Sequence, residues 1–255
     1  MIDPTLRFSS RVENYIKYRP SYPGGVIETL ARECRLTGNS IIADIGSGTG
    51  TLSELFLKNG NQVFCVEPNR EMREAGERLL KKYPDFKSVE GTAEATTLAD
   101  GSVDFVAAGQ AFHWFDRPKA RKEFSRIVKP DGWVVLIWNE RLTDTSPFLS
   151  AYEALLQKYG TDYAAVDHRY VDVNAITEFF APQPVTVRKF ENRQVFDFEG
   201  LRGRLLSSSY TPEAGHPNYR PMLDALRAIF EQHNVGGKVA FDYVTLMYFG
   251  QRSPV

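Results

Sequence analysis

Short apolar runs alternate with amphipathic segments over residues 41–139, and this alternation limits the fold more than any other feature of the sequence. Each run is too short for a buried helix and is typical of a strand. The runs are SIIADI, QVFCVE, FKSVEG, VDFVAAG and GWVVLIW. Strands that alternate with helices favour a parallel sheet with helices on both faces. We therefore predict an α/β fold for this part of the chain.

The pattern changes after Trp138. Residues 147–159 and 176–180 predict helices, and the stretches VTVRKFENRQVFDF and VAFDYVTLMYFG predict two further strands. Between these strands lie about 40 residues that contain the helical segment LRGRLLSSS and an amphipathic helix. Because long connections in compact domains are usually functional, we predict that residues 200–236 form a helical lid over the ligand edge of the sheet.

Charge and composition argue against several classes of protein. The 255 residues carry 31 Lys and Arg against 32 Asp and Glu, so no basic excess predicts a nucleic-acid or membrane partner. The run WVVLIW is too short to span a bilayer, and the amino terminus lacks the apolar core of a secretory signal. Neither the two cysteines nor the four histidines show metal-ligand spacing. We expect a cytoplasmic protein without a metal, and the sequence does not predict the oligomeric state.

The glycine-rich loop GSGTG follows the first predicted strand and is the main candidate for a ligand site. No Lys follows the glycines, which argues against a nucleoside-triphosphate loop, and Thr51 stands where a dinucleotide fingerprint needs a third glycine. Asp44 places a negative charge before the loop. Glu67 lies 67 − 46 = 21 residues after Gly46, at the end of the second strand, where a carboxylate can accept hydrogen bonds from ribose hydroxyls. Glu67 alone does not separate a dehydrogenase from other adenosine-binding enzymes.

The spacing of Gly46, Gly48 and Gly50 behind Asp44 resembles the first motif of the class I S-adenosylmethionine-dependent methyltransferases. The stretches AFHWFD and YIKYRPSYP resemble a small-molecule subgroup related to trans-aconitate methyltransferase, so the resemblance covers about residues 15–139. It implies a Rossmann-like sheet, mostly parallel with an antiparallel carboxyl-terminal strand. It also implies S-adenosylmethionine as cofactor, S-adenosylhomocysteine as product and a small-molecule methyl acceptor.

The resemblance further implies one domain with distinct parts. Residues 1–40 would be an amino-terminal helical cover and residues 41–139 the cofactor-binding core. Residues 140–199 and 237–255 would complete the sheet and helices around the lid at 200–236.

The same resemblance assigns residues to the cofactor. Asp44 would meet its ammonium group, Glu67 its ribose, and Arg19 its carboxylate with help from Tyr15 and Tyr18. Thr92 stands where the family usually has Asp, which weakens the expected adenine contact. The complete predicted set is Arg19, Asp44, Gly46, Ser47, Gly48, Glu67, Pro68, Met72, Thr92, Ala93, Glu94, Gly109 and Gln110.

The acceptor site is predicted from AFHWFD and from the helix LRGRLLSSSY. His113 and Trp114 would wall the transfer site. Arg202 and Arg204 lie about 200° apart on a helix, so only one can face a pocket. Ser209 lies seven residues after Arg202 and near the same face, which favours Arg202 with Ser209 as the pair that holds a carboxylate.

We therefore predict O-methylation of a small carboxylate, a reaction that needs no base. Three alternatives remain at this point: a phenol or amine acceptor with His113 as catalytic base, a protein that binds the cofactor without catalysis, and a nicotinamide-dependent dehydrogenase.

Overall fold

A computed structural model describes residues 16–161, 163 and 172–251. Seven strands in this part of the chain form one sheet in the order β3-β2-β1-β4-β5-β7-β6. Strands β1 to β5 pair in parallel, whereas β7 is antiparallel to both of its neighbours. The predicted sheet, mostly parallel with an antiparallel carboxyl-terminal strand, is confirmed. The strands are β1 (Ile41–Ile45), β2 (Gln62–Val66), β3 (Phe86–Val89), β4 (Val103–Gly109), β5 (Val128–Arg141), β6 (Thr186–Phe196) and β7 (Val239–Gln251).

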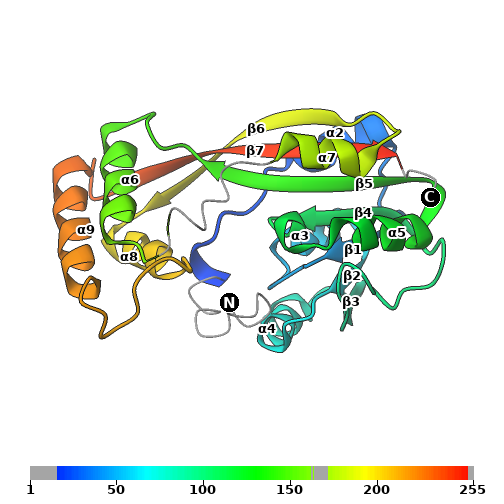
Figure 1. Ribbon diagram of the computed structural model, residues 1–255, viewed down its shortest axis with the longest axis horizontal. Coiled ribbons are helices and arrows are strands. Elements are labelled where there is room, and N and C mark those ends of the chain that lie inside the picture. Colours follow the sequence, from blue (N-terminus) through cyan, green and yellow to red (C-terminus); the bar gives the residue numbers. More distant parts are fainter. Residues whose placement is uncertain (1–15, 162, 164–171, 252–255) are drawn as a thin grey trace.

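Helices cover both faces of the sheet, as predicted (Figure 1). On one face α2 and α3 bury Leu30 and Phe56, and on the other α5 and α7 bury Phe124 and Phe179. The helices are α2 (Gly25–Cys34), α3 (Thr51–Lys58), α4 (Arg70–Leu80), α5 (Arg117–Ile127), α6 (Pro147–Tyr159), α7 (Val173–Phe180), α8 (Phe198–Leu206) and α9 (Tyr219–His233), with a short 3-10 helix, η3 (Phe112–Trp114).

Side-chain caps fix where two of these helices begin. The Asn69 side chain accepts a hydrogen bond from the Met72 N–H, so α4 starts directly after β2. Asp116 caps α5 in the same way, with Pro118 in the first turn, where its missing N–H costs nothing. Because these caps follow the carboxyl ends of β2 and β4, they hold the intervening loops at one edge of the sheet.

Strands β5, β6 and β7 extend well beyond the four strands beside them and carry α6, α8 and α9 at their far end (Figure 1). We call these three helices and the strand ends that they cover the helical lobe. The predicted fifth strand ends at Trp138, but β5 continues to Arg141 because its last residues pair with β7 as far as Tyr243.

A separate apolar cluster forms the core of the helical lobe. It joins Leu149 of α6, Leu201 of α8, Leu226 of α9 and Phe241 of β7, none of which is exposed to solvent. Residues 200–236 therefore share a core with α6. The predicted start of the lid at residue 200 falls within this one packed unit. Whether this insertion opens and closes as a lid stays a prediction.

Residues 16–24 run between the sheet and the helical lobe. The Ser21 carbonyl accepts hydrogen bonds from Asn139 of β5 (3.2 Å) and Asn192 of β6 (2.7 Å). Tyr18 lies so close to Gly203 of α8 that a Cβ at Gly203 would collide with the Tyr18 ring. This segment thus ties the two parts of the molecule together.

Candidate functional site

A cavity of about 400 Å³ lies between the carboxyl ends of the parallel strands and the helical lobe. Its residues come from both sides. The sheet side contributes Gly46, Gly48, Thr51, Glu67, Pro68, Asn69, Met72, Thr92, Ala93, Glu94, Gly109, Gln110, Ala111, His113, Trp114 and Phe115. The other side contributes Arg19, Pro20, Tyr22, Asn139, Glu140, Arg141, Tyr163, Arg204, Ser209, Tyr210 and Tyr243.

The glycine-rich loop between β1 and α3 forms one end of the cavity. Gly46, Gly48 and Gly50 all have positive φ values, 67°, 58° and 86°, a conformation that residues with a Cβ rarely adopt. A Cβ at Gly46 would also lie 2.7 Å from the Ala111 Cβ. The Gly46 N–H donates to the Val66 carbonyl at 2.9 Å, which ties the loop to the end of β2. Gly46 and Gly48 thus bring the backbone of the loop into the cavity wall without a side chain.

Glu67 lies in the cavity wall directly after β2. One carboxylate oxygen accepts from the Gly48 N–H and the other from the Asn69 N–H, each at 2.8 Å. Burial raises the pKa of Glu67, although these two N–H groups oppose the change. Because each carboxylate oxygen has two lone pairs, both oxygens can still accept a hydrogen bond from a ligand hydroxyl. These two N–H groups thus hold the Glu67 carboxylate in the position from which it would bind a ligand.

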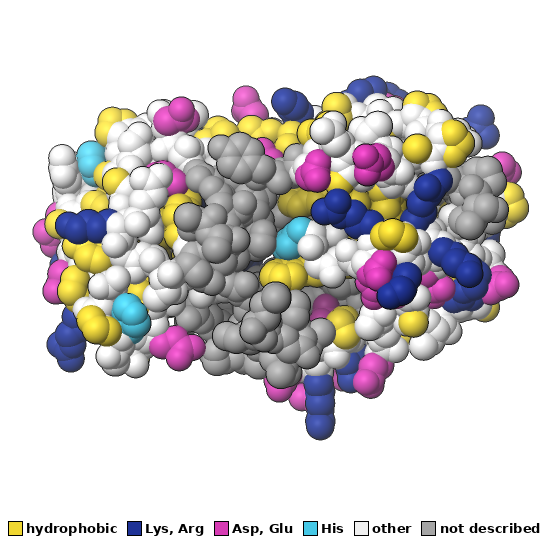
Figure 2. All heavy atoms as spheres, viewed as in Figure 1, with side chains coloured by type: hydrophobic (Ala, Val, Ile, Leu, Met, Phe, Trp, Pro, Cys, Tyr) yellow, Lys and Arg dark blue, Asp and Glu magenta, His cyan; other side chains and the backbone are white. Residues whose placement is uncertain are grey.

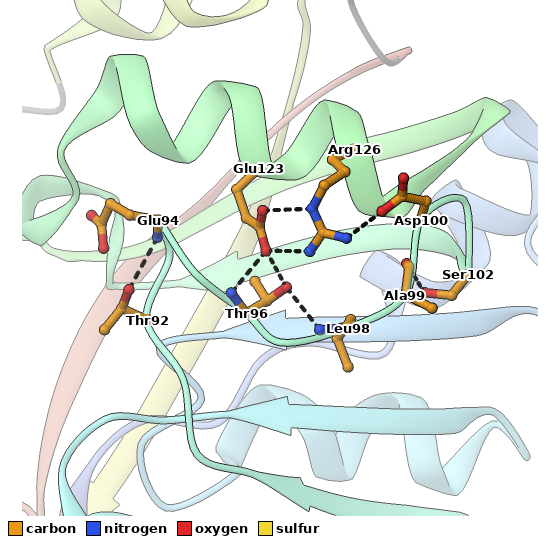
Figure 3. A network of polar contacts seen from close by, with 9 residues as sticks. All are labelled: Thr92, Glu94, Thr96, Leu98, Ala99, Asp100, Ser102, Glu123 and Arg126. Carbon is orange, nitrogen blue, oxygen red and sulfur yellow. Dashed lines mark hydrogen bonds and ion pairs between the residues drawn. The ribbon is translucent and has the colours of Figure 1, made fainter.

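The loop after β3 carries Thr92, Ala93 and Glu94 into the cavity wall, and a polar network holds it against α5 (Figure 3). Both the N–H and the hydroxyl of Thr96 donate to the Glu123 carboxylate, at 2.8 and 2.6 Å. Arg126 donates to the same carboxylate through two nitrogens. Burial raises the pKa of Glu123, but the hydrogen bonds from Arg126 and Thr96 outweigh it and lower the pKa to about 2. The charged carboxylate therefore anchors the loop.

The middle of the cavity is formed where β4 ends. Gln110 has a positive φ of 57°, a strained conformation for a residue other than glycine, and its side chain donates to the Asn139 carbonyl at 3.0 Å. His113 and Trp114 follow in η3, and their rings lie 4.6 Å apart. Trp114 is 36% exposed, which is high for a large aromatic side chain and places part of it at the cavity surface.

Two arginines, Arg141 and Arg204, line the end of the cavity in the helical lobe. Arg204 of α8 is only 5% exposed, and it donates to the Ser208 hydroxyl at 3.0 Å and to the Tyr243 hydroxyl at 3.4 Å. No carboxylate of the described residues pairs with it. Arg141 of β5 does have such a partner, because its Nη2 lies 2.5 Å from the Glu153 carboxylate. The buried Arg141 Nη1 has no hydrogen-bond partner among the described residues.

Most of the predicted site residues meet in this cavity, whereas Asp44, Ser47, Tyr18 and Arg202 do not line it. Asp44 is fully buried behind the glycine loop, where it accepts from the Ser53 hydroxyl at 2.5 Å, and burial raises its pKa to about 7. It does not reach the cavity, so the structure does not place it beside a cofactor ammonium group. Ser47 lines only a minor cleft behind the loop. Tyr15 lies outside the described residues.

The prediction for Arg202 is wrong, because its exposed side chain pairs with Glu199 on the surface of α8 and does not reach the cavity. Arg204 lies there instead, together with the predicted Ser209. Helix geometry correctly predicted that Arg202 and Arg204 cannot both face the cavity. The choice between them was wrong, because Arg204 faces it. Gly203 of α8 packs against Tyr18, and the sequence shows no sign of this contact.

Sequence reasoning missed most of the cavity residues outside the parallel sheet. Tyr22 lies within the stretch YIKYRPSYP, so that motif held a signal for it. Arg141 and Tyr243 are brought together by the antiparallel pairing of β5 with β7, and no local motif marks them. The other missed residues are Pro20, Asn139, Glu140, Tyr163, Arg204 and Tyr210.

Known proteins share the fold that forms this cavity. Residues 43–136 match the family described as "Methyltransferase domain". A putative type II methyltransferase from Anaeromyxobacter dehalogenans has a similar structure, with a TM-score of 0.67 and 21% identity over 93% of this chain and 100% of that one. The chain has the class I methyltransferase fold. The similarity covers the helical lobe as well as the sheet, because almost the whole chain aligns.

Two further relatives bear on the methyltransferase domain. An uncharacterized methyltransferase-like protein of Schizosaccharomyces pombe is 35% identical over 156 residues, which are 61% of this chain and 59% of that protein. The match thus spans about three fifths of that relative. The structure of phosphoethanolamine N-methyltransferase 2 from Haemonchus contortus, solved in complex with S-adenosyl-L-methionine, has a TM-score of 0.58 and 14% identity over 99% of this chain and 59% of that one. This chain therefore shares its fold with a protein whose structure was solved with this cofactor.

Within the described ranges, no group of three or more potential metal ligands occurs and no helix is long and apolar enough to cross a membrane. On the face shown in Figure 2, acidic and basic side chains are interspersed among the described atoms, in keeping with the net charge of −1.

Proposed function

We propose that this chain is an S-adenosylmethionine-dependent methyltransferase that methylates a small carboxylate-bearing molecule on oxygen, in the manner of the small-molecule subgroup related to trans-aconitate methyltransferase. We place this activity in the cytoplasm. The observation that carries the proposal is Arg204, a buried cation without a described carboxylate partner, which lines the same cavity as Glu67 and the glycine loop. A buried charge needs a counter-charge, and an anionic acceptor supplies one.

The residues at the sheet end of the cavity fit the cofactor. Glu67 retains lone pairs that can accept both ribose hydroxyl protons, and Gly48 leaves room beside it because a Cβ there would meet nothing closer than 3.4 Å. Pro68, Met72 and Ala93 supply apolar surface for the adenine. Arg19 brings a cation from the other side of the cavity, towards the cofactor carboxylate. When bound, the cofactor supplies a methyl group already activated by its sulfonium charge.

The residues of the helical lobe would bind and orient the acceptor. Arg204 can donate further hydrogen bonds to its carboxylate, and Ser209 adds a hydroxyl at the same end. His113 and Trp114 would limit the acceptor to one approach and exclude water. Orientation of this kind can contribute roughly 7–11 kcal/mol to lowering a reaction barrier. A carboxylate oxygen is already a nucleophile, so no residue has to remove a proton.

Mass spectrometry tests this proposal directly. The protein is incubated with a small-molecule extract and with S-adenosylmethionine labelled in its methyl group. The proposal predicts a labelled methyl ester that alkali hydrolyses back to a carboxylate. A labelled phenol ether or amine would contradict carboxylate methylation and favour His113 as a base. Cofactor binding without any labelled product would favour a protein that binds the cofactor without catalysis.

A further inference from the structure

Side-chain amides of β5 and β6 hold the amino-terminal segment against one face of the sheet. The Ser21 carbonyl accepts hydrogen bonds from both Asn139 and Asn192. Three residues earlier, the Tyr18 carbonyl accepts from the Gln194 side chain at 3.2 Å. The segment is therefore fixed at two points by side chains of the sheet.

Strand register brings Asn139, Thr245 and Asn192 together on this face. Asn139 lies directly opposite Thr245, and Asn192 lies opposite Tyr243, two residues before Thr245. The Thr245 hydroxyl donates to the Asn139 Oδ1 at 2.5 Å, and the Asn192 amide donates to the same oxygen at 3.2 Å. Because the Asn139 Oδ1 faces two donors and its Nδ2 faces the Ser21 carbonyl, the amide fits in one orientation.

Asn139 joins two parts of the cavity wall. Its backbone carbonyl accepts from the side chain of Gln110, which lines the middle of the cavity. Its side chain holds Ser21, whose neighbours Pro20 and Tyr22 both line the cavity. Asn139 is itself 8% exposed and is buried at the junction of these two parts.

Ser21 lies between two contacts that the segment makes with the rest of the site. On one side, Arg19 donates to the Ser207 carbonyl at the end of α8, at 3.2 Å. On the other, Tyr22 packs so closely on the end of β4 that a Cβ at Gly109 would collide with its hydroxyl. A shift of the Ser21 carbonyl would therefore displace both Arg19 and Tyr22 in the cavity wall.

We propose that Asn139 is a positioning residue of the cofactor site, because its amide fixes the Ser21 carbonyl and through it the placement of Arg19 and Tyr22. This inference rests on the proposed function, which puts the cofactor carboxylate towards Arg19. Asn139→Asp keeps the shape of the side chain and leaves an acceptor for Thr245. It replaces the donor that faces Ser21 by a second acceptor oxygen, which repels the carbonyl.

Hydrogen exchange of the backbone amides in residues 16–24 of the ligand-free protein tests the first step. Asn139→Asp should make these amides exchange about fivefold faster or more. Asn61→Asp is the matched control, because the buried Asn61 amide also donates to carbonyls, those of Thr37 and Ser40, but before β1 and β2, at the opposite edge of the sheet. It should leave exchange in the segment unchanged. Wild-type exchange in Asn139→Asp would overturn the proposal.

Calorimetry with S-adenosylhomocysteine tests the second step and needs no acceptor. Asn139→Asp should weaken binding about fivefold or more, whereas Asn61→Asp should bind as wild type does even where its stability falls.

Asn192→Ala is the second, milder variant, on the half-buried edge strand β6. Asn192 donates to Ser21 but is not among the described residues that line the cavity, so weaker binding in this variant would support transmission through the segment. Unchanged affinity in both Asn139→Asp and Asn192→Ala would overturn the role of Asn139 and leave the proposed reaction intact. The expected affinities without any methyl ester in the labelling experiment would overturn only the reaction.

Discussion

The two ends of the cavity are built in different ways. At the sheet end, the loops that follow consecutive strands supply the glycine backbone and one carboxylate, Glu67, which accepts from the Gly48 and Asn69 N–H groups. At the lobe end, long side chains from β5, α8 and β7 meet, and Arg204 has no carboxylate partner among the described residues. The sheet end is suited to a ligand that stays the same. The lobe end is formed by individual side chains, so single substitutions there can change which ligand binds.

The largest effect is expected from removing the charge at the lobe end. Arg204→Met should lower kcat/KM for the acceptor by roughly 10- to 150-fold, because a hydrogen bond to a charged group contributes about 1.5–3 kcal/mol. Cofactor affinity, measured by calorimetry, should stay unchanged. Arg202→Met is the matched control, because Arg202 lies on the same helix but pairs with Glu199 at the surface. Equal losses in the two variants would contradict a specific role for Arg204.

At the sheet end, a smaller effect is expected on cofactor binding alone. Glu67→Ala should weaken binding of S-adenosylmethionine by roughly 1–3 kcal/mol, because the ribose hydroxyls lose a charged acceptor. The exposed Glu71 on α4 supplies the control, and Glu71→Ala should bind the cofactor normally. Calorimetry compares the three proteins, and unchanged affinity in Glu67→Ala would remove the ribose assignment.

The smallest effect concerns the loop that supports the sheet end. Glu123→Gln should lower the free energy of unfolding by about 1–2 kcal/mol near neutral pH, because Thr96 and Arg126 lose a charged partner. The pKa of Glu123 is about 2 in the folded protein against 4.5 ordinarily, so its contribution is complete above about pH 4.5 and is lost as the pH falls towards 2. The difference between wild type and variant should shrink over that range.

Denaturant unfolding at several pH values measures this difference. Glu74→Gln serves as the control, because Glu74 pairs with Arg70 on the exposed face of α4 and such pairs contribute little. A Glu123→Gln protein that is as stable as wild type at neutral pH would show that the network in Figure 3 does not hold the loop.

The same contrast explains what the sequence could predict. Gly46, Glu67 and Ala93 belong to loops that directly follow short apolar strands, so local pattern placed them at one sheet edge. Local pattern also predicted β7 as a strand and the helices of the lobe, whereas the antiparallel direction of β7 was predicted from the family resemblance. The orientation of α8 was not, because Arg202 and Arg204 both lie about 80° from the direction shared by Leu201 and Leu205. In the structure Arg204 lies in the cavity and Gly203 packs against Tyr18, a contact that local pattern does not show.

Asp44 shows a second limit of sequence reasoning. Its position before the glycines was read as a place beside the ligand, yet a residue at the end of a central parallel strand can also point into the core. In the structure it hydrogen-bonds Ser53 of α3 and is completely buried. Strand alternation alone could not decide this, because both faces of the central strand are covered.

A crystal structure of the protein with S-adenosylhomocysteine and benzoate tests the division of the cavity most directly. The account predicts the ribose hydroxyls on the Glu67 carboxylate, the adenine beside Ala93, and the benzoate carboxylate on Arg204. A nucleoside bound away from Glu67, or a benzoate carboxylate that contacts neither Arg204 nor Ser209, would contradict it.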